Sequence, residues 1–187
     1  VPEINWAHAA AIEHQRKRLG TKRGFVAVKP SCSIQGYVPA LHPLRDFGLD
    51  QVIVCTYQAI SGAGKTFSNW PEMVDNVIPF IGSEERKSEV EPLKIWGEMK
   101  DGVIVPTNRP TISAQCYRVA CSDGHLAAVS VSFDSKPSRD EILARWSSFE
   151  GLPQKLKLPS APKQFLTYLA EESRPQTRLD RDLDPRN

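Results

Sequence analysis

The stretch TISAQCYRVACSDGHLAAVSVSFD (111–134) contains two strand-like runs, 111–120 and 125–134, on either side of Ser-Asp-Gly. Strand-forming residues flanking a turn-forming tripeptide predict an antiparallel pair of strands. Alternate residues of a strand share one face. His125 therefore shares the apolar face of the second strand, and Arg118 shares the apolar face of the first.

Two earlier apolar runs, 24–30 and 52–58, also predict strands, and the segment 33–48 between them predicts a helix disturbed by Pro39 and Pro43. Strand, helix and strand in this order predict one right-handed crossover with parallel strands. A crossover followed by antiparallel strands favours the α+β class. We expect a mixed, largely antiparallel sheet with helices packed on one face.

Further helices are predicted from their ends. Residues 5–19 favour a helix that ends at Gly20, and the charged segment 83–99 favours another. Ser138 and Glu141 form a capping-box pattern that predicts a helix start. The end of the chain, 174–187, reads as a polar tail with little structure of its own.

Composition narrows the function classes. The chain has 187 residues, is 40% hydrophobic and 25% charged, and carries a net charge of +2. This balance gives no electrostatic footprint for nucleic acid or an anionic membrane. No apolar run approaches the length of about 20 residues that a membrane span needs. The chain begins at Val1 rather than Met, so we expect a fragment of a longer protein, comprising one domain.

The four cysteines, at 32, 55, 116 and 121, form no C-x-x-C pair. A zinc site is therefore not predicted, and we expect no metal. Cys55 and Cys116 lie within strand patterns, which favours small buried side chains. The chain reads as a reduced, cytoplasmic protein.

QAISGAGKT (58–66) resembles a phosphate-binding loop that follows a strand. Such a loop needs its Lys and Thr at the start of a helix. Pro71 falls about where the second turn of that helix would be, and proline costs about 3 kcal/mol inside a helix. We therefore expect a glycine turn that serves another site.

Three residues together suggest chemistry that none indicates alone. Cys32 opens a predicted helix after a strand, where the helix N-terminus favours the thiolate. A thiolate nucleophile, an imidazole at His125 and a carboxylate-binding guanidinium at Arg118 form a covalent acyl-transfer site. Taken singly, each has a structural explanation: a buried thiol, a core histidine and a snorkelling arginine. Glu91 and Lys94 alone read as a surface pair.

Five motifs, in this order, resemble the aspartate-β-semialdehyde dehydrogenase family, in the branch shared by archaea, fungi and some bacteria. They are SCSIQGYVPAL, TYQAISGAGKT, NVIPFIGSEERKSEVEPLKIWG, CYRVACSDGHLAAVSV and RPQTRLDRD. The resemblance covers roughly residues 24–183. It implies a fold like the catalytic domain of glyceraldehyde-phosphate dehydrogenase and an assembly of two or four identical chains. It also implies that NADPH reduces 4-phospho-L-aspartate to L-aspartate 4-semialdehyde, releasing phosphate.

The resemblance also implies a role for each matching residue. Cys32 is the nucleophile, His125 the general acid/base, and Gln58 orients the substrate. Arg118 holds the substrate carboxylate, Glu91 its ammonium group and Lys94 its phosphate. Ser61 and Gly62 approach the nicotinamide of NADP.

Two departures from the family pattern leave alternatives open. Ser31 stands where the family has Asn, whose amide can stabilise an oxyanion. No G-x-G-x-x-G dinucleotide fingerprint occurs, and the family's C-terminal helix is not recognisable, so this chain resembles the catalytic and dimerisation domain alone. We expect it to be inactive in isolation. The alternatives are a related acyl-CoA reductase and a non-catalytic, dimerising relative.

Overall fold

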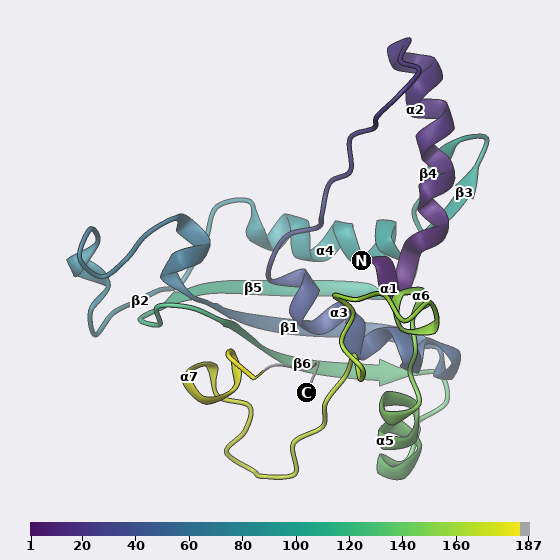
Figure 1. Ribbon diagram of the computed structural model, residues 1–187. Coiled ribbons are helices and arrows are strands. Elements are labelled where there is room, and N and C mark those ends of the chain that lie inside the picture. The colour runs from purple at the N-terminus through teal and green to yellow at the C-terminus, as the bar shows by residue number, and fades with distance from the viewer. Residues whose placement is uncertain (184–187) are drawn as a thin grey trace.

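A mixed four-stranded sheet forms the centre of the protein in a computed structural model that describes residues 1–183 (Figure 1). The strand order is β2-β5-β1-β6. β1 pairs in parallel with β5 and antiparallel with β6, and β2 pairs antiparallel with β5. The strands are β1 (Leu49–Gln58), β2 (Val77–Ile78), β5 (Thr111–Val119) and β6 (His125–Phe133).

The two long strands that follow each other in sequence are not paired with each other. β5 and β6 run in opposite directions, as predicted, but β1 lies between them and is hydrogen-bonded to both. The predicted hairpin is therefore wrong. The turn residues Ser122–Gly124 reverse the chain direction between β5 and β6. The apolar β1 lies between these two strands, so both of its edges are hydrogen-bonded.

The predicted strand at 24–30 is also wrong within the described residues, as is the crossover that joined it to 52–58. These residues are extended but have no strand partner, and Phe25, Val26 and Val28 are exposed. Val26 exchanges two backbone hydrogen bonds with the Gln15 side chain instead. The segment 24–30 thus has the composition of a strand but, among residues 1–183, no neighbouring strand to pair with its backbone. The parallel partner of β1 is β5.

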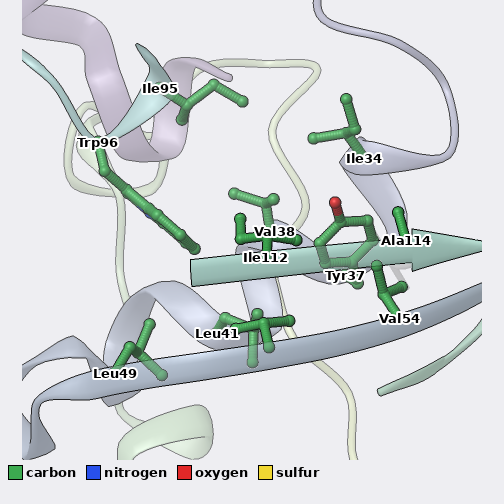
Figure 2. Packing of buried hydrophobic residues seen from close by; sticks show 11 residues of the cluster. Ile34, Tyr37, Val38, Leu41, Leu49, Val54, Ile95, Trp96, Ile112 and Ala114 are labelled. Carbon is green, nitrogen blue, oxygen red and sulfur yellow. The ribbon is translucent and has the colours of Figure 1, made fainter. Parts of the chain in front are cut away.

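Two helical segments cover one face of the sheet. α3 (Ile34–Leu41) continues into the 3-10 helix η2 (His42–Phe47), and α4 (Glu84–Ile95) lies over β5. Tyr37 donates a hydrogen bond to the Ser88 carbonyl at 3.0 Å, which joins α3 to α4. Figure 2 shows the apolar core between these helices and the sheet, and its buried members are Ile34, Tyr37, Val38, Leu41, Leu49, Val52, Val54, Ile95, Trp96, Ile112 and Ala114.

The remaining elements lie around this core. The predicted helix 5–19 is divided into η1 (Trp6–Ala10) and α2 (Ala11–Leu19), and the short α1 (Pro2–Asn5) precedes it; α2 ends at Gly20 in the left-handed conformation, as predicted. The predicted helix 83–99 ends earlier, because β3 (Glu98–Lys100) forms a hairpin with β4 (Val103–Val105). The others are η3 (Ile60–Ala63), η4 (Pro71–Met73), α5 (Arg139–Ser147), α6 (Leu152–Lys155) and α7 (Thr177–Asp180).

The predicted α+β class, with a mixed sheet covered by helices on one face, is confirmed. The predicted capping box is confirmed too, because the Ser138 hydroxyl accepts from the Glu141 N–H while the Glu141 carboxylate accepts from the Ser138 N–H. The predicted polar tail contains α7, and its last four residues, 184–187, lie outside the described residues. Among residues 1–183, no helix has the length and apolar character needed to span a membrane.

Candidate functional site

The strand register brings three of the predicted site residues side by side. In the parallel pair β1–β5, Gln58 lies opposite Arg118, and in the antiparallel pair β1–β6 it lies opposite His125. The end of β1, the end of β5 and the start of β6 therefore meet at one edge of the sheet. Gln58 and Arg118 are buried there, on the face that the helices cover.

Cys32 and His125 form a contact pair. Cys32 lies just before α3, and its Sγ is 3.2 Å from His125 Nε2. On the other side of the ring, His125 Nδ1 accepts a hydrogen bond from the Ala59 N–H at 3.0 Å. With Nδ1 used as an acceptor, the neutral imidazole carries its proton on Nε2, directed at the sulfur. The Nε2–H thus points at the Cys32 sulfur as a hydrogen-bond donor.

The surroundings of His125 keep it neutral. Burial lowers the pKa of His125 below the ordinary value, and the Arg118 guanidinium adds to this effect, while a hydrogen bond with the Gly124 backbone and the charge of Glu84 oppose it. A neutral imidazole whose Nε2–H is fixed in direction can donate a hydrogen bond to a negatively charged sulfur or oxygen beside it. This arrangement suits a site in which charge develops next to a nucleophile.

Arg118 is a buried cation with an incomplete set of partners. Its residue surface is only 6% exposed, and Nη1 donates to the Ala59 carbonyl at 2.7 Å. No carboxylate lies within salt-bridge distance of it in the described part of the chain. Burial lowers the pKa of Arg118, although the nearby Cys32 and Glu84 oppose this effect. A buried guanidinium without an acid partner is suited to receive the carboxylate of a ligand.

Glu84, which the sequence did not single out, lies at the centre of a hydrogen-bond cluster in the site. Its carboxylate accepts from the Ser31 hydroxyl at 2.9 Å, from Gln58 Nε2 at 3.3 Å and from Lys87 Nζ at 2.8 Å. Burial opposes its ionisation, but the hydrogen bonds from Lys87, Ser31 and Gln58 together lower the pKa of Glu84. The cluster joins the start of α4 to the residue before Cys32 and to the end of β1.

Glu91 and Lys94 occupy different positions from Glu84 and Lys87. Glu91 accepts a hydrogen bond from the Ser31 N–H at 2.8 Å, so it anchors the backbone next to Cys32. Lys94 is exposed, and its side chain takes part in no hydrogen bond or salt bridge with the described residues. Both pairs have the spacing Glu-x-x-Lys, seven residues apart, which corresponds to about 10 Å along a helix. That repeated spacing was the signal that could have pointed to Glu84 and Lys87.

The glycine loop after β1 runs beside the side chains of Arg118 and His125. Ser61 and Gly62 lie in η3 and are exposed. A Cβ added to Gly62 would come within 3.0 Å of Arg118 Nη1 and 3.2 Å of His125 Cε1. A larger residue here would push the Arg118 or His125 side chain away by a few tenths of an ångström, so glycine favours this close approach. Lys65 and Thr66 follow in exposed, non-helical backbone, which does not suit a phosphate-binding loop.

The other cysteines have different surroundings. Cys116 is fully buried, and burial raises its pKa. Cys55 is only half-buried, because it lies on the face of β1 away from the helices; the prediction that it is a buried side chain is wrong. In residues 1–183, no cluster of three His, Cys, Asp or Glu side chains has a geometry that could hold a metal ion.

The chain is similar in sequence and in structure to proteins of known family. The model of the family described as "Semialdehyde dehydrogenase, dimerisation domain" matches residues 41–186. An aspartate-semialdehyde dehydrogenase of Methanothermobacter thermautotrophicus is 41% identical over 98% of this chain and 53% of its own length. A malonyl CoA reductase (NADP) of Metallosphaera sedula is 33% identical over 97% of this chain and 51% of its own length.

The crystal structure of a Candida albicans aspartate-semialdehyde dehydrogenase with NADP superimposes with a TM-score of 0.81 at 36% identity. It covers 97% of this chain, which in turn covers 53% of that protein. The chain therefore spans about half the length of the relatives that it matches. The relatives' matches extend across nearly the whole chain, whereas the family match begins after Cys32.

Proposed function

Because the chain belongs to the semialdehyde dehydrogenase dimerisation-domain family, we propose that it forms the substrate-binding, catalytic and dimerising part of an oxidoreductase. The reaction is the reduction of 4-phospho-L-aspartate to L-aspartate 4-semialdehyde with release of phosphate. One observation carries this proposal: the 3.2 Å contact between Cys32 and His125, beside the buried, acid-free Arg118. A thiolate, a proton donor and a carboxylate receptor at one place are the parts that acyl transfer to sulfur needs.

Cys32 acts first. Its thiolate attacks the carbonyl carbon of the acyl phosphate, the carbon–oxygen bond to phosphate breaks, and phosphate leaves with that electron pair. The product on the chain is an aspartyl thioester. NADPH would supply the hydride that reduces the thioester carbonyl. The His125 Nε2–H donates a hydrogen bond to the oxygen that becomes negatively charged, and the electron pair of that oxygen re-forms the carbonyl as the carbon–sulfur bond breaks, which releases the aldehyde and restores the thiolate.

Substrate recognition falls to charged residues around the pair. Arg118 receives the α-carboxylate through its free guanidinium edge. The contacts favour Glu84 for the ammonium group and Lys87 for the phosphate, since both lie in the Ser31–Gln58 cluster. In the alternative, Glu91 binds the ammonium group and Lys94 the phosphate. The Glu91 carboxylate would then accept from the Ser31 N–H and from the ligand at the same time.

Matched variants of the complete enzyme separate the two assignments. Glu84→Gln should raise KM for the aspartyl substrate at least tenfold more than Glu91→Gln, because one charge-assisted hydrogen bond contributes about 1.5–3 kcal/mol. Lys87→Met should likewise raise the KM for the aspartyl phosphate more than Lys94→Met does, because the phosphate loses its cation. A larger rise in KM for the variants of Glu91 and Lys94 would assign the two roles to those residues.

The cofactor part of the proposal rests on the glycine loop. Ser61 and Gly62 are exposed next to His125, and the missing side chain at Gly62 leaves room for a ring to approach. These residues fit the nicotinamide end of NADP, and the rest of the cofactor would be held outside this chain. Gly62→Ala should therefore weaken NADPH binding in the complete enzyme and also disturb His125. This chain alone should show no steady hydride transfer.

The uncovered face of the sheet is the surface that we assign to dimerisation. Ile53, Tyr57 and Val77 lie on it with 56%, 39% and 55% of their surface exposed, and Tyr57 stacks on Tyr117. Such an apolar sheet face needs a cover, and the family's description favours a second copy of this chain. Tyr57→Glu should convert a dimer to a monomer in analytical ultracentrifugation. A homotetramer and a cytoplasmic location remain predictions.

An acyl-CoA reductase is the second candidate, because a malonyl CoA reductase (NADP) is 33% identical to this chain. It would use the same Cys32–His125 pair but would have no need of an acidic residue for an ammonium group. The acid at Glu84, held ionised by three donors, favours the aspartyl substrate. Turnover of a CoA thioester, with none of aspartyl phosphate, would select the second candidate. An unreactive Cys32 would instead support the non-catalytic, dimerising relative.

A further inference from the structure

The turn that precedes His125 is held on one side by the glycine loop. Ile60 N–H donates to the Cys121 carbonyl at 2.9 Å, and Ser61 N–H donates to the Ser122 carbonyl at 3.2 Å. Gly124 adopts a φ of +86°, the left-handed region, immediately before His125. These bonds fix one side of the turn and leave its outer side to be held by another segment.

The C-terminal segment 174–181 holds that outer side. Arg181 Nη1 donates to the Ser122 hydroxyl at 3.0 Å and to the Asp123 carbonyl at 3.2 Å. Thr177 Oγ1 lies 3.1 Å from Cys121 Sγ. A Cβ at Gly124 would be only 3.3 Å from Thr177 Cβ, so the two backbones are closely packed. In Figure 1, α7 lies beside the start of β6, where this contact occurs.

The segment has its own internal fastening. The Arg174 guanidinium and the Asp180 carboxylate form a bidentate pair, and the Gln176 N–H also donates to Asp180. The Arg174 and Asp180 side chains are 23% and 12% exposed, less than most ion-paired side chains of the protein. The motif RPQTRLDRD thus folds on itself and presents Thr177 and Arg181 to the turn.

We propose that Arg181 and Thr177 are positioning residues for His125, and that they act by clamping the turn 122–124. This inference rests on the proposed function, in which the Nε2–H of His125 serves the reaction at Cys32. The imidazole must keep two contacts at once, 3.0 Å to the Ala59 N–H and 3.2 Å to Cys32 Sγ. A shift of the preceding backbone breaks one of them, and a misplacement of about 1 Å can cost about 100-fold in rate.

The test compares four variants of this chain: Arg181→Ala, Arg181→Lys, Thr177→Val and the control Arg178→Ala. Arg178 lies on the same short helix, is exposed, and donates no hydrogen bond within residues 1–183. One readout is the rate of Cys32 alkylation by iodoacetamide, followed by peptide mapping. The second is the pair of ¹⁵N chemical shifts of the His125 ring, which report the tautomer and which a loss of stability alone would not change.

If Arg181 and Thr177 position His125 through the turn 122–124, Arg181→Ala lowers the Cys32 alkylation rate about tenfold. It also replaces the single Nε2–H tautomer of His125 by a mixture of the two tautomers. Thr177→Val has a smaller effect in the same direction, Arg181→Lys restores most of the rate, and Arg178→Ala leaves both readouts unchanged. An unchanged tautomer and rate in Arg181→Ala would overturn the proposal. Equal losses in Arg181→Ala and Arg178→Ala would do the same. A Cys32 that labels no faster than Cys55 in the unmodified chain would instead count against the proposed function, while the tautomer would still decide about the clamp.

Discussion

Replacing the buried Arg118 by methionine should stabilise this chain. The guanidinium is 6% exposed and keeps one hydrogen bond, to the Ala59 carbonyl at 2.7 Å, which contributes about 1.5–3 kcal/mol because the donor is charged. Desolvation of a buried ion costs several kcal/mol, and no acid among residues 1–183 pairs with Arg118 to offset it. Methionine fills a similar volume without that cost.

The expected gain in the free energy of unfolding of Arg118→Met is about 1–3 kcal/mol, in the range seen when buried ions are replaced by apolar side chains. For a chain of this length each kcal/mol raises Tm by about 2–4 °C. Differential scanning calorimetry and urea unfolding at pH 7 measure both quantities. Arg109→Met is the control, because Arg109 is exposed and paired with Asp50 and Asp134, and this variant should lower Tm slightly.

A loss of more than about 1 kcal/mol in Arg118→Met, with the fold retained, would refute this reasoning, since a truncated structural anchor costs at least one hydrogen bond. Arg118 would then be an anchor for the glycine loop rather than a cation reserved for a ligand. The expected gain in stability, accompanied in the complete enzyme by loss of aspartyl-substrate binding, is the trade-off typical of a binding residue.

Three further predictions concern titration and reactivity. His125→Asn should lower the rate of Cys32 alkylation about tenfold, because the Nε2–H that points at the sulfur is lost. Cys116 should label last, because burial raises its pKa; labelling of Cys116 before Cys32 would contradict Cys32 as the nucleophile and Cys116 as a buried, unreactive thiol. The hydrogen bonds to Glu84 lower its pKa in the folded state, so its contribution to stability is present above pH 4.5 and is lost as the pH falls through the folded value. The destabilisation caused by Glu84→Gln, measured by urea unfolding, should therefore shrink between pH 6 and pH 3.5, and a constant difference would argue against an ionised Glu84. Burial lowers the pKa of His42 to about 4 from 6.5, so stability should fall as the pH drops from about 6.5 towards 4; His42→Gln should flatten that part of the profile, and an unchanged slope would show that other groups cause it.

The sequence predicted the faces of the strands better than their neighbours. The alternation of β5 and β6 correctly placed Arg118 and His125 on the helix-covered face, because side-chain direction is a local property of a strand. The pairing was missed because β1 fits between β5 and β6, and only the three-dimensional arrangement shows this. The run 24–30 has the composition of a strand, but strand formation also needs a partner that the described residues do not provide.

In the site too, the sequence motifs indicated individual residues, whereas contacts between residues far apart in the chain could be seen only in the structure. Cys32, His125, Gln58 and Arg118 were singled out from motifs and lie together in the structure. The sequence did not single out Glu84 and Lys87, because two Glu-x-x-Lys pairs follow each other on α4 and the sequence does not show which turn of the helix reaches the end of β1. Which pair binds the substrate stays a prediction. The role of the C-terminal motif was also hidden, since its contacts to the turn 122–124 join residues more than fifty positions apart.

The most direct measurement of the central claim is a search for the acyl intermediate on Cys32. The complete protein that carries this chain is incubated with 4-phospho-L-aspartate in the absence of NADPH, quenched in acid and mapped by peptide mass spectrometry. We expect an aspartyl thioester on the peptide that contains Cys32, cleaved by hydroxylamine and absent from Cys32→Ser, with phosphate released in equal amount. An adduct on another residue, or the same adduct yield in Cys32→Ser, would show that Cys32 is not the nucleophile.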